Sequence, residues 1–258
     1  MSGRVTLVGG GPGREDLLTL AAVRALAAAD VVLYDRLAPH EGLAALAPNA
    51  QLIDVGKRPG HHAIPQSEIE SLLVERALAG LHAVRLKGGD PYVLGRGSEE
   101  VLACHRAGVS VEVIPGVTSS VAVPGAAGIP LTHRGISHLF TVVSGHAPLT
   151  DVELTHLAGL GGTIVVLMGV NSLPSLTAGL VRAGMSASMP VAIIERGFRS
   201  DQRTTIGDLT DIVTTAGRAH VTSPAVVVVG EVVRLAHDGD ASAAELMERA
   251  AALGAGVA

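Results

Sequence analysis

Short apolar segments recur along the first half of the chain, and each is long enough to form one β-strand. They lie at 4–8, 31–34, 51–55, 83–87 and 110–114. Between them, 17–30 and 67–80 place leucine, valine and alanine at helical spacing. Ser67 and Glu70 have the spacing of a capping box at the start of the second helix. This alternation predicts a parallel-rich sheet covered by helices.

A second series of strand-length segments follows a stretch rich in glycine, proline and serine at 115–135. The expected strands are 139–144, 163–168, 190–195, 203–207 and 225–230. The fourth of them alternates polar and apolar residues, as antiparallel strands do, so the second sheet is expected to be mixed. We therefore expect an α/β protein with an N-terminal lobe, a C-terminal lobe and an alanine-rich tail, helical or disordered. The expected boundaries are 1–132, 133–236 and 237–258.

Composition argues against several kinds of partner. The chain has 19 Lys and Arg residues and 24 Asp and Glu residues, so its net charge is negative. No overall positive field exists to hold nucleic acid. Two Tyr, two Phe and no Trp are too few to stack single-stranded bases. Apolar stretches fall short of the roughly 20 residues that span a bilayer. Because Cys104 is the single cysteine and the start has no signal-peptide pattern, we expect a cytoplasmic protein without nucleic-acid or membrane partners.

The loop 9-GGGPGRED-16 joins a strand to a helix, where a dinucleotide pyrophosphate would bind. The dinucleotide fingerprint fails, because its third glycine position is Arg14 and Pro12 lacks an N–H. The loop predicts either close approach of a compact ligand or a plain tight turn. Asp35 ends the second strand, where an oxidoreductase would bind a ribose and where a helix N-cap is the simpler interpretation. An NAD-dependent oxidoreductase therefore stays an alternative.

The segment 54-DVGKRPGHHAIPQ-66 predicts an exposed cationic loop around Lys57. Lys57 and Lys87 are the only lysines among the 19 basic residues, and both lie in segments rich in glycine. Side chains of adjacent residues, such as the two histidines of this loop, are expected to point in different directions, and no further ligand completes a set. We therefore expect no metal site.

The richest segment for chemistry is 85-RLKGGDPYVLGRGSEE-100. Its glycines let backbone approach a ligand, Asp90 can accept hydrogen bonds, and Arg96 can bind a carboxylate through two parallel hydrogen bonds. Glu99 and Glu100 could merely favour the N-terminus of the next helix. The sequence has no G-x-S-x-G elbow, Walker A segment or H-E-x-x-H helix, which argues against hydrolases, NTPases and zinc proteases.

These segments together resemble the tetrapyrrole methyltransferase family, in particular its uroporphyrinogen-III C-methyltransferase branch. The resemblance is carried by VGGGPG, YDRL, GKRPGHH, RLKGGDP, GRGSEE, PGVTS and GIPLTHRG. It implies the two-lobed class III methyltransferase fold, in which each lobe is a mixed sheet flanked by helices and the cofactor binds in the cleft between lobes. It also implies a homodimer.

The resemblance further implies a cofactor, a substrate and site residues. The cofactor is S-adenosyl-L-methionine, with S-adenosyl-L-homocysteine as its product, and its implied contacts are Pro12, Gly88, Gly89, Asp90, Val93, Thr118, Ser119, Met168, Gly197 and Ala225. Competing candidates for the proton step are Asp35, Lys57 and Arg96. Implied substrate contacts are Arg36, Glu99, Arg134 and Met168.

The family reaction methylates uroporphyrinogen III at C-2 and then C-7, through precorrin-1 to precorrin-2, for sirohaem or cobalamin biosynthesis. The eight carboxylates of that substrate account for arginines in glycine-rich loops of an acidic protein. The alternatives are another precorrin methyltransferase and a non-enzymic tetrapyrrole-binding protein. One departure from the family pattern is Arg14, which replaces the usual Asp; either Glu15 or Asp16 supplies that acid, or the acid is dispensable.

Overall fold

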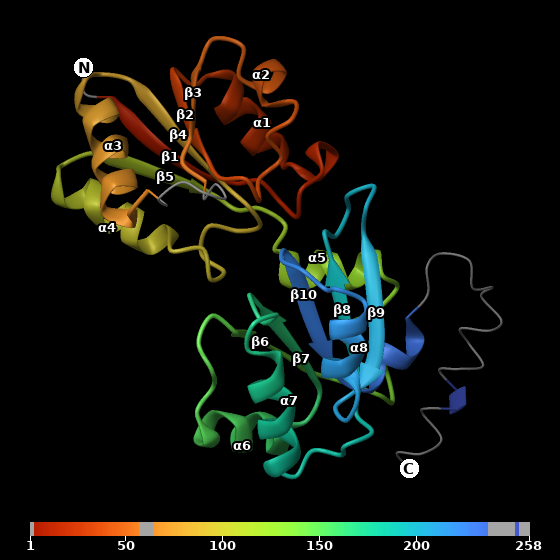
Figure 1. The fold of residues 1–258 in the computed structure, drawn as a ribbon. Helices are drawn as coiled ribbons and strands as arrows, with labels where there is room; N and C mark the ends of the chain where they lie inside the picture. The colour runs from red at the N-terminus through yellow and green to blue at the C-terminus, as the bar shows by residue number, and fades with distance from the viewer. Residues whose placement is uncertain (1–2, 57–63, 237–250, 253–258) are drawn as a thin grey trace. The chain divides into compact units, whose positions relative to one another are not determined.

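The computed structural model describes residues 3–56, 64–236 and 251–252 (Figure 1). The chain divides into two compact units, Met1–Ser119 and Ser120–Ala258, each built on a five-stranded sheet. The sequence placed the lobe boundary at 132/133, later than the structure does. The reason is packing, since Val123 and Ile129 are buried in the core of the second unit. Nearly all of the tail expected at 237–258 lies outside the described residues.

The first unit is an all-parallel sheet covered by helices on both faces. Its strands are β1 (Arg4–Gly9), β2 (Val31–Tyr34), β3 (Gln51–Asp54), β4 (His82–Lys87) and β5 (Ser110–Ile114), in the order β3-β2-β4-β1-β5. Its helices are η1 (Glu15–Leu17), α1 (Leu20–Ala27), α2 (Leu43–Leu46), α3 (Gln66–Leu78) and α4 (Gly97–Arg106). Successive side chains of β1 alternate between two cores, one under α3 and α4 and one under α1 and α2. The predicted parallel-rich sheet is confirmed. Because helical crossovers join its strands, all of its strand pairs are parallel, so the mixed sheet that the resemblance implied for this lobe is not found among the described residues.

The second unit holds a mixed sheet. Its elements are α5 (Ser119–Ala126), β6 (Phe140–Ser144), α6 (Asp151–Leu160), β7 (Thr163–Leu167), α7 (Leu173–Arg182), β8 (Pro190–Glu195), β9 (Arg203–Asp208), α8 (Ile212–Arg218), β10 (Ala225–Val229) and η2 (Glu231–Leu235). The strand order is β6-β7-β10-β8-β9, with β6 and β7 parallel and the other pairs antiparallel. Both the mixed sheet and the antiparallel β9 are therefore confirmed.

The capping box expected at Ser67 and Glu70 is wrong. Helix α3 begins at Gln66 with Pro65 at its N-cap, and no side chain caps it. Ser67 is already helical, whereas an N-cap residue needs extended backbone. The same sequence pattern does form a capping box at the start of α6, where Thr150 and Glu153 exchange hydrogen bonds.

The single cysteine, Cys104, lies on the buried face of α4. Burial raises the pKa of the Cys104 thiol to about 11, and the nearby Glu100 carboxylate acts in the same direction. Because the thiolate is the reactive form, we expect the native protein to resist a disulfide reagent at about pH 8, while the urea-unfolded chain reacts fully. A colorimetric thiol assay checks this, and rapid labelling of the native protein would contradict it.

Candidate functional site

Three glycine-containing loops meet at the carboxyl edge of the first sheet, after the neighbouring strands β1, β4 and β5. The Gly11 N–H donates to the Gly89 carbonyl at 3.1 Å, and the Gly89 N–H donates back at 2.7 Å. A Cβ on Gly9 would lie 2.6 Å from Gly116 Cα and 2.8 Å from the Gly89 oxygen. Only glycines allow the three backbones to approach this closely. Gly9, Gly11 and Gly89 are themselves buried, so this edge is formed by closely packed backbone rather than by side chains.

Asp90 ties two of these loops together. Its Oδ2 accepts a hydrogen bond from the Gly116 N–H at 3.1 Å, and its Oδ1 accepts one from the Tyr92 N–H at 2.8 Å. From the sequence, the Asp90 carboxylate was expected to accept hydrogen bonds from a ligand. In the structure, both of its oxygens already accept hydrogen bonds from backbone N–H groups. Each oxygen keeps a second lone pair for another donor. Asp90 can therefore hold the loops and accept a ligand hydrogen bond together.

The residues implied as cofactor contacts in the first unit all lie in these three loops or directly after them. They are Pro12 after β1, then Gly88, Gly89, Asp90 and Val93 after β4, then Thr118 after β5 and Ser119 at the start of α5. Gly89 has a positive φ of 66°, and a Cβ there would lie 3.4 Å from Ser119 Oγ. Glycine backbone, a hydroxyl and a carboxylate at one edge fit a compact ligand with polar groups.

The implied contacts of the second unit also share one sheet edge. Met168 directly follows β7, Gly197 follows β8, and Ala225 begins β10. Because β10 runs antiparallel to both neighbours, its first residue lies beside their last residues; Ala225 is paired with Glu195. The sequence assigned these residues by resemblance alone, and the strand pairing brings them together.

Residues with strained backbone conformations lie in the loops that carry the candidate site residues. Among the described residues, the non-glycine positions with positive φ are Leu94, Arg96, Met168, Arg196, Phe198 and His220. All but His220 lie in loops that follow β4, β7 or β8. Such conformations cost about 1 to 3 kcal/mol each and persist only where the surroundings enforce them. Their location independently marks the loops that carry the candidate site residues.

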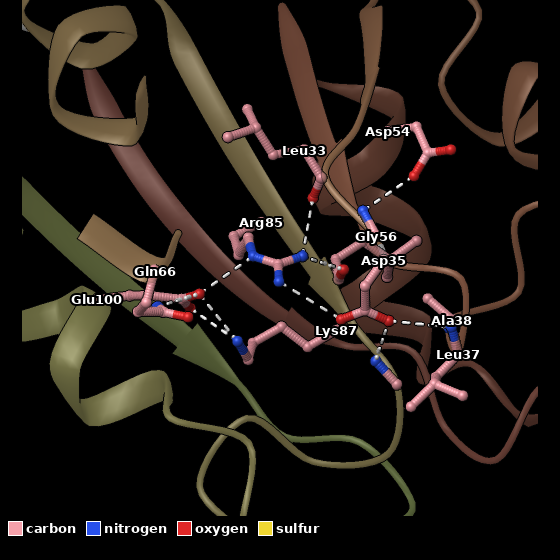
Figure 2. Close-up of polar contacts among 12 residues, drawn as sticks. Leu33, Asp35, Leu37, Ala38, Asp54, Gly56, Gln66, Arg85, Lys87 and Glu100 are labelled. Atoms are coloured by element: carbon pink, nitrogen blue, oxygen red, sulfur yellow. Dashed lines mark hydrogen bonds and ion pairs between the residues drawn. The ribbon is translucent and has the colours of Figure 1, made fainter. Parts of the chain in front are cut away.

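A charged network is buried beside the loop that follows β4 (Figure 2). Glu100 of α4 is 0% exposed, and its carboxylate accepts hydrogen bonds from Lys87 Nζ at 2.9 and 3.0 Å. Arg85 Nε and Gln66 Nε2 each donate to Glu100 Oε1 at 3.1 Å. Arg85 Nη2 also lies 3.4 Å from Asp35 Oδ2, which extends the network to a candidate site residue.

Sequence reasoning missed this network, because it treated Glu100 only as an acid favouring a helix start. The available signal was alternation, since Arg85 and Lys87 stand two apart in a strand and face the same side. Burial lowers the pKa of the Lys87 ammonium, and the Arg85 charge lowers it further. The Glu100 and Asp35 carboxylates oppose that shift only partly.

Asp35 lies at the carboxyl end of β2, as predicted. Its Oδ1 accepts hydrogen bonds from the backbone N–H groups of Leu37, Ala38 and Gly88, at 3.1 to 3.3 Å. The helix N-cap interpretation is wrong, because residues 35–38 form a turn. Arg36 is half-exposed and pairs with Asp54 at 3.4 Å.

Lys57, another of the three candidates for the proton step, lies outside the described residues. Asp16, one candidate for the missing acid of the first loop, pairs with Arg14.

Among the described residues, no group of three or more His, Cys, Asp and Glu side chains could hold a metal ion. No helix in the described part of the chain is long and apolar enough to cross a membrane.

Arg96 and Glu99 form one exposed pair at the start of α4. Arg96 Nε and Nη2 donate to the two Glu99 oxygens at 2.8 and 2.6 Å, and the Arg96 hydrogen bonds lower the pKa of Glu99. A substrate carboxylate would compete with Glu99 for this guanidinium. Arg134, in the second unit, lies in the turn between His133 and Ser137 and forms no ion pair with a described residue.

Glu195 is buried at the end of β8, next to the candidate Gly197. Its carboxylate accepts hydrogen bonds from Arg203 Nε at 2.6 Å, from the Thr222 N–H at 3.0 Å and from Arg196 Nη1 at 3.0 Å. Burial alone would raise the pKa of Glu195, but these donors together outweigh it and lower the pKa. The fold therefore stabilises the ionised form of the Glu195 carboxyl group.

We expect the Glu195 contacts to make the fold acid-sensitive. Because its pKa is lower folded than unfolded, the stabilisation is present above the ordinary glutamate range and is lost as the pH falls through the folded pKa. Glu195→Gln should cost about 1 to 3 kcal/mol at neutral pH and should weaken the acid dependence. Urea unfolding at several pH values measures both, and an unchanged acid dependence would contradict the assignment.

Comparisons with known proteins show which proteins this chain is similar to. Residues 4–213 match the family model of the tetrapyrrole (corrin/porphyrin) methylases. The S-adenosyl-L-methionine-dependent uroporphyrinogen III methyltransferase of Methanosarcina barkeri is 46% identical, over 92% of this chain and 94% of its own. The uroporphyrinogen-III C-methyltransferase of Methanocaldococcus jannaschii is 46% identical, over 91% and 98%. The Thermus thermophilus uroporphyrin-III C-methyltransferase, crystallised with S-adenosyl homocysteine, matches with a TM-score of 0.76 at 44% identity, covering 90% of this chain and 100% of that chain.

Proposed function

Because the chain belongs to the tetrapyrrole (corrin/porphyrin) methylase family, we propose that it methylates uroporphyrinogen III. The methyl donor is S-adenosyl-L-methionine, the methylated carbons are C-2 and then C-7, and the products are precorrin-2 and S-adenosyl-L-homocysteine. The observation that carries the proposal is the 46% identity, over nearly the full length of both chains, to a relative named for this reaction. Membership of this family is evidence for methyl transfer and against the hydride transfer that the oxidoreductase alternative would require.

The residues at the carboxyl edge of the first sheet fit the proposed cofactor. Glycine backbone at Gly88 and Gly89, the Asp90 carboxylate and the Ser119 hydroxyl offer the mixed surface that an adenosine and an amino-acid group need. Pro12, Val93 and Thr118 are proposed as further contacts in that unit; Met168, Gly197 and Ala225 are proposed in the second unit. Bound S-adenosyl-L-methionine supplies a methyl carbon that is already electrophilic.

The protein itself would align the substrate and manage one proton. A pyrrole carbon of the substrate forms the new bond to the methyl carbon as the methyl–sulfur bond breaks, and a meso proton then leaves to restore conjugation. Asp35, Lys57 and Arg96 are the proposed candidates for this proton step. Arg96 keeps its own proton, because its hydrogen bonds to Glu99 raise the pKa of the guanidinium. It would therefore act through its charge, and the group that receives the proton would be Asp35 or Lys57.

Arg36, Glu99, Arg134 and Met168 are the proposed substrate contacts. The arginines among them would hold substrate carboxylates by charge-assisted hydrogen bonds.

Incubation with methyl-labelled S-adenosyl-L-methionine and uroporphyrinogen III under reducing conditions tests the proposal. We expect two labelled methyl groups in the tetrapyrrole product, measured by mass spectrometry. Another precorrin methyltransferase would leave uroporphyrinogen III unlabelled and methylate a later intermediate. A non-enzymic binding protein would retain the tetrapyrrole without labelling it, and either outcome would overturn the proposal.

We expect S-adenosyl-L-homocysteine, but not NAD or NADP, to raise the melting temperature. A ligand at 100 times its dissociation constant stabilises the folded state by about 2.7 kcal/mol. The first loop lacks the dinucleotide fingerprint, so the nucleotides should leave the melting temperature unchanged. A thermal-shift titration measures all three ligands, and the reverse order of effects would contradict methyl transfer.

The proposal extends to assembly and location. We propose a homodimer, supported by the family resemblance and testable by sedimentation equilibrium. We also propose a cytoplasmic enzyme of sirohaem or cobalamin biosynthesis. A single cysteine that cannot form an intramolecular disulfide agrees with a reducing compartment.

A further inference from the structure

The loop 88–96 carries Asp90 and Arg96, and its two ends are linked through buried charges. The loop begins directly after Lys87, the last residue of β4, and ends directly before Gly97, the first residue of α4. Glu100 lies in the first turn of that helix, and its carboxylate accepts hydrogen bonds from Lys87 Nζ at 2.9 and 3.0 Å. One ion pair thus closes the loop at its base (Figure 2).

A second chain of contacts runs from the same carboxylate to the first residue of the loop. Arg85 Nε donates to Glu100 Oε1 at 3.1 Å, and Arg85 Nη2 lies 3.4 Å from Asp35 Oδ2. Asp35 Oδ1 in turn accepts a hydrogen bond from the Gly88 N–H at 3.3 Å. Glu100 is therefore connected both to the end of β4 and to the neighbouring loop after β2.

Stability alone is a weak reason for such a network. Arg85 and Lys87 are each 4% exposed and Glu100 is 0% exposed, so three charges are taken out of water. Replacing a buried ion pair by apolar residues of similar volume is often neutral or stabilising. What the charged groups add is directional hydrogen bonding, which fixes where the connected segments lie.

We propose that Glu100 is a positioning residue for the reaction: through Lys87 and Arg85 it holds loop 88–96, and with it Asp90 and Arg96, in the arrangement that methyl transfer needs. This inference rests on the proposed function. Glu100 itself is not proposed to contact substrate or cofactor. It affects methyl transfer by fixing the position of loop 88–96.

The test compares two variants with different charge balance. Glu100→Gln keeps the side-chain shape but leaves Arg85 and Lys87 without their shared anion, so we expect a lower melting temperature and at least a tenfold loss in kcat. Adding Lys87→Met removes the repulsion between the two cations. In this double variant we expect the melting temperature to recover while kcat stays low, because the loop is still not held.

A control variant separates positioning from general loss of stability. Leu73 lies on the buried face of α3, in the apolar core that α3 and α4 cover, and its side chain forms no hydrogen bond or ion pair of the network, so Leu73→Ala opens a cavity without removing a charge. At a temperature where every variant is folded, we expect Leu73→Ala to keep the wild-type kcat. A double variant that regains wild-type kcat, or a Leu73→Ala variant that loses as much kcat as Glu100→Gln, would overturn the proposal.

Hydrogen exchange keeps this inference distinguishable from the proposed function. We expect peptide amides of 88–96 to exchange at least tenfold faster in Glu100→Gln and in the double variant than in the wild type. Unchanged exchange would overturn the loop-holding role even if activity fell. If the wild type itself fails to methylate uroporphyrinogen III, the proposed function fails, and a reaction-positioning role for Glu100 fails with it, whatever exchange shows about the loop.

Discussion

Gly116→Ala should abolish the response to S-adenosyl-L-homocysteine. A Cβ at this position would lie 2.6 Å from the Gly9 carbonyl carbon and 2.7 Å from Gly9 Cα, and it would also clash with the Gly89 oxygen. All of these neighbours are backbone atoms, so the loops after β1, β4 and β5 have to separate. Because misplacement of a site by about 1 Å can cost on the order of 100-fold in function, we expect at least that loss in affinity.

The measurement is calorimetric titration of a Gly116→Ala protein whose circular dichroism matches the wild type. Gly217→Ala is the matched control, because that glycine lies in α8 and a Cβ there meets nothing within 4 Å. Alanine is favoured over glycine inside a helix by about 0.5 to 1 kcal/mol, so the control should be as stable as the wild type and bind normally. Wild-type affinity in Gly116→Ala would contradict a cofactor site at this edge.

Alanine at either Arg96 or Arg134 should impair turnover without weakening cofactor binding. If each guanidinium holds a substrate carboxylate or tunes the proton step, its removal should cost about 1.5 to 3 kcal/mol in transition-state binding, which is roughly a 10- to 150-fold loss in kcat/KM. The thermal response to S-adenosyl-L-homocysteine should persist in both variants, since neither side chain is a proposed cofactor contact.

The control for these arginines is Arg182→Ala. Arg182 forms an exposed ion pair with Asp151 at 3.2 Å, and such pairs contribute little to stability. Its steady-state kinetics should match those of the wild type. Wild-type kcat/KM in Arg96→Ala or in Arg134→Ala would remove that arginine from the substrate site.

Several strands could be predicted because they are continuous apolar runs bounded by turn residues, as 225–229 is. The edge that carries the candidate site could also be predicted, since ligands of open α/β sheets bind at the carboxyl ends of the strands. Asp35 and Gly88 lie there because β2 and β4 are parallel neighbours.

The contacts between distant segments could not be predicted. Nothing local in the sequence distinguishes the exposed Glu99 from the buried Glu100, because their roles depend on which side of α4 faces β4. The boundary between the two units near Ser119 could not be predicted either, since long-range packing places Val123 of α5 on the second sheet. The roles proposed for Lys57 and Arg134 stay predictions from the family resemblance.

The most direct test of the central claim is the position of the transferred methyl groups. With S-adenosyl-L-methionine carrying a ¹³C-labelled methyl group and with uroporphyrinogen III as substrate, carbon NMR of the product should show two labelled methyl carbons, attached at C-2 and C-7. An unlabelled tetrapyrrole, or label attached at any other carbon, would contradict the account.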